Sequence, residues 1–204
     1  MHKFLNIYQT ALARDVLGFG NRMVIWVAGC PFSCHGCIEE KLQPDHLGNS
    51  ISVADVQEKI YDHLSEIDGI TFSGGEPLWQ SDSLITLFDL LPSTLDKMVF
   101  TGYVKSELNK IQRKCFNYFD LVVDGRFVKN KMGNFLWRGS SNQKFYSPTG
   151  KYSNILDELY ASESAGLDIQ VEKQEMFFYG IPTKNNEIDI IKNKIAQQGV
   201  MTYG

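Results

Sequence analysis

Cysteine is scarce in this sequence, since only four occur among 204 residues, and this excludes a fold stabilised mainly by disulfides. No apolar run reaches the roughly 20 residues of a membrane-spanning helix. No targeting segment is recognisable, so we expect a cytoplasmic protein without a membrane anchor. The net charge of −4 excludes a general basic surface for nucleic acid. Neither repeats nor low-complexity segments divide the chain, and we expect one domain over residues 1–204.

Three of the four cysteines are concentrated in one short loop. Cys30, Cys34 and Cys37 follow the apolar run 23–28, which is short and β-branched, as a buried strand is. The thiols therefore lie at the carboxyl end of a predicted strand, where α/β proteins place their chemistry. The C-x3-C-x2-C spacing indicates a zinc site or an iron–sulfur cluster.

The fourth ligand distinguishes these alternatives. A structural zinc site uses four protein ligands, whereas a four-iron cluster held by three cysteines leaves one iron open to a substrate or cofactor. Cys115 is distant in sequence and lies in an amphipathic stretch, where we expect a buried thiol. His35 is too close to its neighbouring cysteines to complete a tetrahedron; it either tunes a cluster or faces solvent. The spacing favours the open cluster.

Strands and helices alternate along most of the chain. After the run 23–28, the pattern predicts strands at 70–72, 97–100 and 121–123, each ending in a loop with glycine. This alternation predicts an α/β fold with a parallel sheet and right-handed crossovers. Four units are too few for a closed eight-stranded barrel, so we expect a partial, open βα barrel.

Other elements are expected around this core. The pattern predicts an edge strand at 4–8 and a late hairpin from 169–172 and 176–179. Helices are expected at 52–67, capped by Ser52 or Asn49, and at 81–91, 106–114 and 186–197.

A second motif, Gly74-Gly75-Glu76-Pro77, follows the predicted strand 70–72. Paired glycines let backbone groups approach a small ligand. Glu76 supplies an acceptor for an ammonium, and Pro77 suits the start of a helical turn. Alone, the motif is equally typical of a tight turn. Because it lies one strand–helix unit after the cysteines, however, the motif predicts a site for an α-amino acid moiety beside an open iron.

Together the two motifs resemble those of the radical S-adenosylmethionine (SAM) superfamily. Cys30, Cys34 and Cys37 match its cluster motif, and residues 74–77 match its GGEP motif. The resemblance implies a [4Fe–4S] cluster whose open iron chelates the amino and carboxylate groups of SAM. Gly36 is a departure, because many members carry an aromatic residue there that packs on the adenine.

Further motifs narrow the resemblance to activases of anaerobic (class III) ribonucleotide reductase. They are spread over residues 18–182, and the most specific is WRGSSNQ at 137–143. The others are Gly18-x-Gly20-x-Arg22, Gly29-Cys30, Cys34-x-Gly36-Cys37, Thr101-Gly102-Tyr103, Val123-Asp124-Gly125-Arg126-Phe127 and Gly180-Ile181-Pro182. The resemblance implies a minimal radical SAM core with few added domains.

The resemblance also implies roles. A 5′-deoxyadenosyl radical would abstract hydrogen from a glycine of the reductase, with electrons from a donor such as flavodoxin or ferredoxin. No catalytic residue is expected beyond those that hold cluster and SAM. The residues expected to bind SAM are Gly74, Gly75, Glu76, Thr101 and Asp124. Those considered for contact with the partner are Arg22, Trp137 and Arg138.

Several of these residues have plain structural alternatives. Thr101 suits a strand-end cap, and Asp124 suits a turn before Gly125. Arg22 and Arg138 would otherwise be solvated, and Trp137 would otherwise be a core aromatic.

Two other functions stay open. In the first, the same SAM chemistry would act on another protein, peptide or metabolite. The lack of extra cluster cysteines favours the activase over this alternative. The second is a non-catalytic zinc or iron–sulfur binding module, against which the intact GGEP motif argues.

Overall fold

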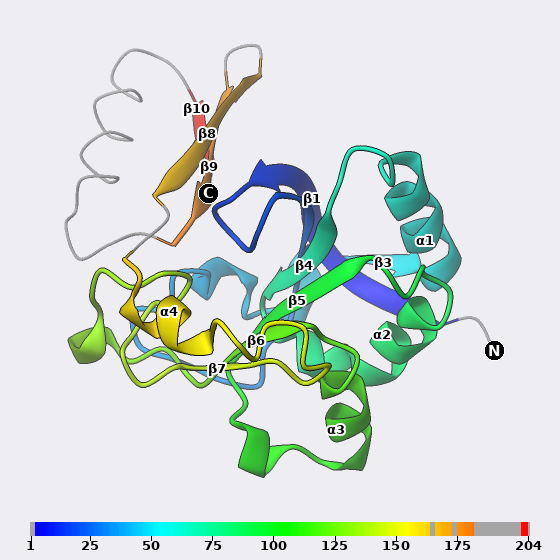
Figure 1. The fold of residues 1–204 in the computed structure, drawn as a ribbon. Helices are drawn as coiled ribbons and strands as arrows, with labels where there is room; N and C mark the ends of the chain where they lie inside the picture. Colours follow the sequence, from blue (N-terminus) through cyan, green and yellow to red (C-terminus); the bar gives the residue numbers. More distant parts are fainter. Residues whose placement is uncertain (1–2, 164–165, 173–174, 182–200, 204) are drawn as a thin grey trace.

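The structure is a computed structural model that describes residues 3–163, 166–172, 175–181 and 201–203. Its main sheet contains seven strands in the order β3-β1-β2-β4-β5-β6-β7 (Figure 1). The strands are β1 (Phe4–Arg14), β2 (Asn21–Val27), β3 (Asn49–Ser52), β4 (Gly69–Gly74), β5 (Asp96–Thr101), β6 (Leu121–Asp124) and β7 (Lys144–Tyr146).

The four central strands run parallel. β2 pairs with β4, β4 with β5, and β5 with β6 in parallel, whereas β1, β3 and β7 join antiparallel. The predicted α/β fold with a parallel, open sheet is therefore confirmed. The register sets Val27 opposite Gly74 and Thr101 opposite Asp124. As a result, the loops that follow the four parallel strands emerge at one edge of the sheet.

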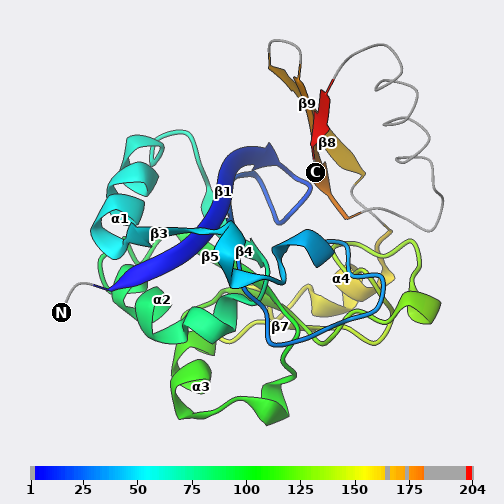
Figure 2. The ribbon, with the colours of Figure 1, turned by 180° about the vertical axis from the view of Figure 1, so that it is seen from behind.

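Three helices cover one face of the sheet, as Figures 1 and 2 show. They are α1 (Val53–Asp62), α2 (Ser81–Phe88) and α3 (Lys110–Phe116). As predicted, Ser52 caps α1, because its Oγ accepts a hydrogen bond from the Asp55 N–H at 3.1 Å. α4 (Leu156–Ala161) packs on the opposite face. Short 3-10 turns occur at Glu40–Leu42, Asp45–Leu47, Pro77–Gln80, Lys105–Glu107 and Lys129–Lys131.

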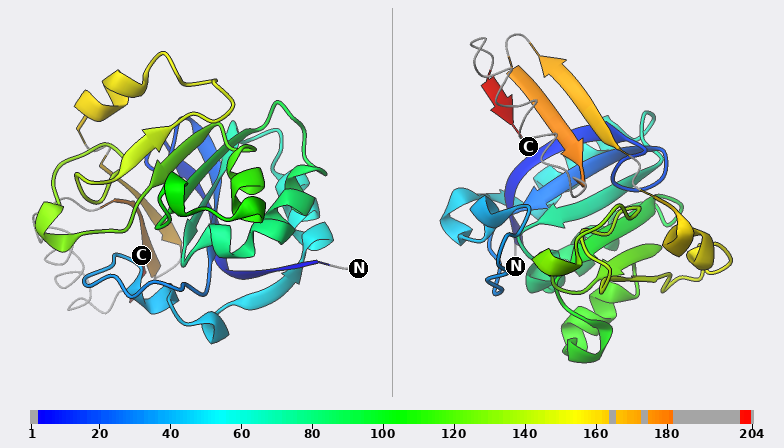
Figure 3. Two further views of the ribbon diagram at one scale, coloured as in Figure 1. Left: turned by 90° about the horizontal axis from the view of Figure 1, so that it is seen from below. Right: turned by 90° about the vertical axis from the view of Figure 1, so that its left-hand side faces the viewer.

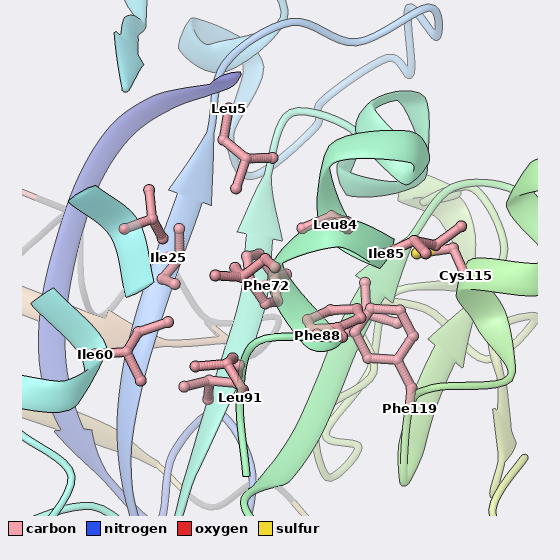
Figure 4. Close-up of a cluster of buried hydrophobic side chains, with 14 of the residues drawn as sticks. Leu5, Ile25, Ile60, Phe72, Leu84, Ile85, Phe88, Leu91, Cys115 and Phe119 are labelled. Atoms are coloured by element: carbon pink, nitrogen blue, oxygen red, sulfur yellow. The ribbon is translucent and has the colours of Figure 1, made fainter. Parts of the chain in front are cut away.

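The core follows the alternation of strand side chains between the two faces. Ile25 and Phe72 point toward the helices and pack with Phe88 and Phe119 (Figure 4). Val24 and Trp26 point to the other face. Burial of each such side chain contributes about 1.5–3 kcal/mol. Cys115 lies fully buried in the helix-side cluster, which confirms the expected buried thiol, and burial raises its pKa to about 12.

A smaller sheet lies beside β1 (Figure 3). It contains β8 (Leu167–Glu172), β9 (Glu175–Gly180) and β10 (Met201–Tyr203), and the predicted hairpin is confirmed by the antiparallel pairing of β8 and β9. The Tyr179 ring packs on Trp26 with the ring centroids 5.5 Å apart. The Gln170 side-chain amide donates to the Leu12 carbonyl at 2.6 Å. These contacts attach the hairpin to β1 and to the face of the main sheet opposite α1, α2 and α3.

Some elements differ from expectation. β1 is longer than the predicted edge strand and lies inside the sheet, between β2 and β3. The helix expected at 52–67 ends at Asp62, and the one expected at 106–114 divides into a 3-10 turn and α3. The terminal helix expected at 186–197 falls outside the described residues. None of the described helices is long and apolar enough to cross a bilayer.

Candidate cluster and cofactor site

The loops after β2, β4, β5 and β6 line one cavity of about 650 Å³. This volume is typical of small-molecule sites. Leu167, Phe178, Tyr179, Gly180 and Ile181 of the smaller sheet also contribute to the wall. The cavity therefore lies at the carboxyl ends of the parallel strands, where the cysteine and GGEP motifs were predicted to meet.

Cys30, Cys34 and Cys37 are free, half-buried thiols, and all three line this cavity. Backbone hydrogen bonds from Gly29 N to Leu42 O and from Cys30 N to Gln43 O, both 2.9 Å, fasten the start of the loop. Burial raises the pKa of Cys30 to about 11 and also raises that of Cys37. Burial thus favours the protonated forms of Cys30 and Cys37, and iron binding must displace their protons.

The thiols suit a cluster better than a single ion. In the part of the chain that the structure describes, no three His, Cys, Asp or Glu side chains converge as a single ion would require. A zinc ion needs all its sulfurs about 2.3 Å from one point. Each cysteine of a [4Fe–4S] cluster binds a different iron, and three free thiols that line one cavity fit that requirement.

The GGEP segment packs tightly against the end of β2. A Cβ added to Gly74, whose φ is +97°, would lie 2.5 Å from Val27 O, and one added to Gly75 would overlap Gly29 O. Gly75 N donates to Val27 O at 2.7 Å, and Glu76 N donates to Gly29 O at 2.8 Å. Because these N–H groups are occupied, the segment offers acceptors to a ligand, as an ammonium needs.

Glu76 is buried in the cavity wall and ringed by donors. One carboxylate oxygen accepts from Leu78 N at 2.9 Å and from Thr101 Oγ at 2.7 Å, and the other accepts from Gly102 N at 2.7 Å. Burial raises the pKa of Glu76 to about 7, although these hydrogen bonds act to lower it. A cationic ligand would favour the ionised form. Thr101 lines the cavity and orients Glu76.

Asp124 occupies a different place from the one expected. It is buried, and its carboxylate accepts from Lys105 N at 2.9 Å, which holds the loop after β5. Burial raises its pKa. The cavity is lined by the next residues, Gly125 and Arg126, and not by Asp124 itself. The structure therefore assigns Asp124 to support of the loop.

The three residues considered for partner contact are buried. Arg22 is 2% exposed and forms an ion pair with Asp96 at 2.7 Å. Trp137 packs edge-on against Phe19 at 4.7 Å between ring centroids. Arg138 lies against the rings of Phe135, Phe145 and Tyr160. None of the three lines the cavity, so the expectation of surface contacts is corrected: tertiary packing encloses all three side chains.

The WRGSSNQ motif instead supports the loop after β6. Gln143 Nε2 donates to Gly125 O and Asn142 Nδ2 donates to Arg126 O, each at 2.9 Å. Ser140 Oγ accepts from Val128 N at 3.1 Å. Amide and hydroxyl side chains commonly form hydrogen bonds with nearby backbone groups in this way. This tendency is the feature of the sequence from which the supporting role of the motif could have been predicted.

Phe32 and Arg126 are site residues that the sequence analysis did not single out. The Arg126 guanidinium lies 4.3 Å from the Phe32 ring centroid, and its two terminal nitrogens donate to the Glu107 carboxylate at 3.1 Å. Phe32 also meets Tyr103 edge-on. These contacts join the cysteine loop to the loops after β5 and β6. His35, in contrast, is exposed and does not line the cavity.

Comparison with known proteins identifies this arrangement. Residues 16–146 match the family model described as "4Fe-4S single cluster domain". An anaerobic ribonucleoside-triphosphate reductase-activating protein of Haemophilus influenzae is 33% identical over 156 residues, covering 69% of this chain and 94% of that protein. The proteins of that name from Escherichia coli K12 and Enterobacteria phage T4 are both 31% identical, covering 68% and 66% of this chain and 96% and 88% of their own.

Among solved structures, QueE from Escherichia coli aligns over 98% of this chain and 94% of its own, with 12% identity and a TM-score of 0.43. That likeness is too distant to carry an argument, and the family rests on the sequence matches. The chain therefore belongs to the 4Fe-4S single cluster domain family within the radical SAM superfamily, as a relative of the anaerobic ribonucleoside-triphosphate reductase-activating proteins.

Proposed function

We propose that this protein installs a glycyl radical on an anaerobic ribonucleoside-triphosphate reductase. When bound, a reduced [4Fe–4S] cluster and SAM would supply the chemistry, namely one-electron cleavage of SAM to methionine and a 5′-deoxyadenosyl radical that would take one hydrogen atom from a glycine α-carbon. The observation that carries the proposal is that three free thiols and a buried carboxylate line the same cavity. The names of the relatives point to the reductase.

Each residue of the cavity has a physical task in this proposal. Cys30, Cys34 and Cys37 would hold the cluster through three of its irons. The carbonyl groups of Gly74 and Gly75, together with Glu76, receive the ammonium of SAM. Thr101 acts through Glu76, which it orients by a hydrogen bond of 2.7 Å.

Asp124 contributes less directly. By holding Lys105 N it fixes the loop that carries Gly102, and Gly102 N donates to Glu76. A Cβ on Gly102 would lie 2.7 Å from the Phe32 ring, so this position also keeps room for the cysteine loop. We propose a flavodoxin or ferredoxin as the physiological electron donor.

The test uses the reductase labelled with deuterium at its glycine α-carbons. The reconstituted protein is incubated anaerobically with dithionite, SAM and this reductase, then frozen for electron paramagnetic resonance. We expect a glycyl radical doublet on the reductase and deuterium in the 5′-deoxyadenosine, detected by mass spectrometry. Cys34→Ala should abolish both, whereas Cys115→Ala should retain both because Cys115 lies in the core.

Other outcomes separate the alternatives. Unlabelled 5′-deoxyadenosine without a doublet would retain the radical SAM chemistry and assign another protein, peptide or metabolite as the target. No 5′-deoxyadenosine from a fully loaded protein would leave only a binding module.

A further inference from the structure

Gly36 lies between Cys34 and Cys37, and the Lys129 side chain occupies the space where its own side chain would begin. The φ of Gly36 is +71°, and a Cβ added there would lie 2.9 Å from Lys129 Cδ. The positive φ favours glycine, and any other residue would also have to displace the Lys129 side chain. The space that an aromatic side chain would enter is filled by the aliphatic part of Lys129.

Lys129 is placed to act inside the cavity. It begins the 3-10 turn Lys129–Lys131 and lines the cavity together with Cys34, Gly36 and Cys37. The turn is held from both sides, because Val128 N donates to Ser140 Oγ at 3.1 Å and Ser141 N donates to Lys131 O at 2.9 Å. The lysine is thus presented by a fixed backbone.

The ammonium of Lys129 is uncommitted. No hydrogen bond or ion pair joins it to another residue of the described ranges. The other cations lining the cavity have contacts of their own: Arg126 is paired with Glu107 at 3.1 Å, and Lys41 lies over the Tyr8 ring. Lys129 therefore carries a positive charge at the cysteine loop that is not ion-paired with any carboxylate of the described residues.

We propose that the Lys129 ammonium would stabilise the reduced form of the bound cluster by its positive charge. Glycine at position 36 leaves space for this lysine beside the cysteine loop. Three thiolates and sulfides make the cluster negative, and reduction adds a further negative charge. A cation nearby favours reduction, since net charge around a cluster sets its potential. The inference rests on the cluster of the proposed function but not on the reductase.

The test is a redox titration of the loaded protein followed by electron paramagnetic resonance. Lys129→Met should make the equilibrium constant for reduction about tenfold less favourable, which is a downward shift of about 59 mV for one electron. Lys129→Arg keeps the charge and should retain the wild-type potential. Lys131→Met is the matched control, because it removes the same charge from the same turn outside the cavity lining.

A second variant tests the link to Gly36. Gly36→Ala should displace Lys129 and lower the potential in the same direction, with cluster content checked by iron and sulfide analysis. Combined with Lys129→Met, it should add little further shift, because the two changes remove one interaction.

The outcomes separate this inference from the proposed function. An unchanged potential in Lys129→Met, or an equal shift in Lys131→Met, would overturn the role of Lys129 alone. A shifted potential without a glycyl radical would support Lys129 and remove the proposed target. A wild-type protein that binds no cluster would overturn both.

Discussion

Two buried carboxylates at opposite ends of β5 have opposite surroundings. Asp96, at the start of the strand, contacts Arg22, Lys151 and Tyr152. Glu76 lies at the other end, where Thr101 donates to it, and its hydrogen-bond donors are all uncharged. Both side chains are nearly inaccessible to solvent. Only one of them has a cation in direct contact.

The difference appears in their pKa values. Burial alone would raise the pKa of Asp96, but the charge of Arg22 and the hydrogen bonds from Lys151 and Tyr152 outweigh it and lower the pKa. At Glu76 burial dominates and raises the pKa to about 7. A buried carboxylate with its own cation serves the fold, whereas one without is prepared for a cation that arrives with a ligand. In the proposed function, that cation is the ammonium of SAM.

The largest effect is expected from breaking the structural pair. Arg22→Met leaves Asp96 buried with Lys151 as its remaining cation, and we expect the free energy of unfolding to fall by about 3 kcal/mol. Urea unfolding of the cluster-free protein measures it. The double variant Arg22→Met/Asp96→Asn should recover part of the loss. A loss below about 1 kcal/mol would show that the pair is not structural.

The second prediction uses the opposite pKa shifts. The raised pKa of Glu76 means that its contribution to stability is present below its ordinary pKa of 4.5 and is lost as pH rises through about 7. As the pH rises from about 5 to about 8, the free energy of unfolding of Glu76→Gln should therefore increase by about 2–3 kcal/mol relative to that of wild type.

Asp96→Asn should behave in the opposite sense. The lowered pKa of Asp96 makes its contribution present at neutral pH and lost only as the solution becomes acidic. Urea unfolding at several pH values measures both variants, and parallel pH profiles for the two would contradict the comparison.

The third prediction concerns ligand affinity. Glu76→Gln should weaken SAM binding to the cluster-loaded protein by about 10- to 100-fold, since a hydrogen bond to a charged group contributes about 1.5–3 kcal/mol. Asp120→Asn is the matched control, because it changes a buried carboxylate that accepts from Lys97 N at 2.9 Å near the start of β5 and does not line the cavity. We expect it to change affinity by no more than about twofold, within the roughly 0.5 kcal/mol of a change away from the site. Anaerobic calorimetry would decide, and equal losses would contradict the assignment.

The smallest effect is expected at the exposed ion pair. Glu107 and Arg126 are 39% and 45% exposed, and their attraction is screened by water and salt. Glu107→Gln should leave the urea midpoint of unfolding unchanged. A marked drop in the midpoint would show that the packing of Arg126 on the Phe32 ring depends on this ion pair.

Those parts of the candidate site that depend on local residue spacing could be predicted from the sequence. Cys30, Cys34 and Cys37 form one motif within eight residues, and residues 74–77 form another. Their meeting in space followed from apolar runs that predict parallel strands. β3 and β7 were missed because they are short, and α4 because it covers fewer than two turns.

Burial and long-range packing could not be predicted in the same way. Arg22 lies 74 residues before Asp96, so nothing near it in sequence indicates a buried ion pair. The WRGSSNQ motif was recognisable, but its contact with the loop after β6 depends on the β6–β7 pairing. The packing of Lys129 on Gly36 likewise joins two loops that follow different strands.

The most direct test of the account is reconstitution of the cluster in wild-type protein, Cys34→Ala and Cys115→Ala, with iron, sulfide and 5′-deoxyadenosine measured in each. The account predicts a [4Fe–4S] cluster and SAM cleavage in wild type and Cys115→Ala, and neither in Cys34→Ala, with all three proteins folded. SAM cleavage retained in Cys34→Ala, or lost in Cys115→Ala while it remains folded, would contradict the assignment of the cavity as the radical SAM site.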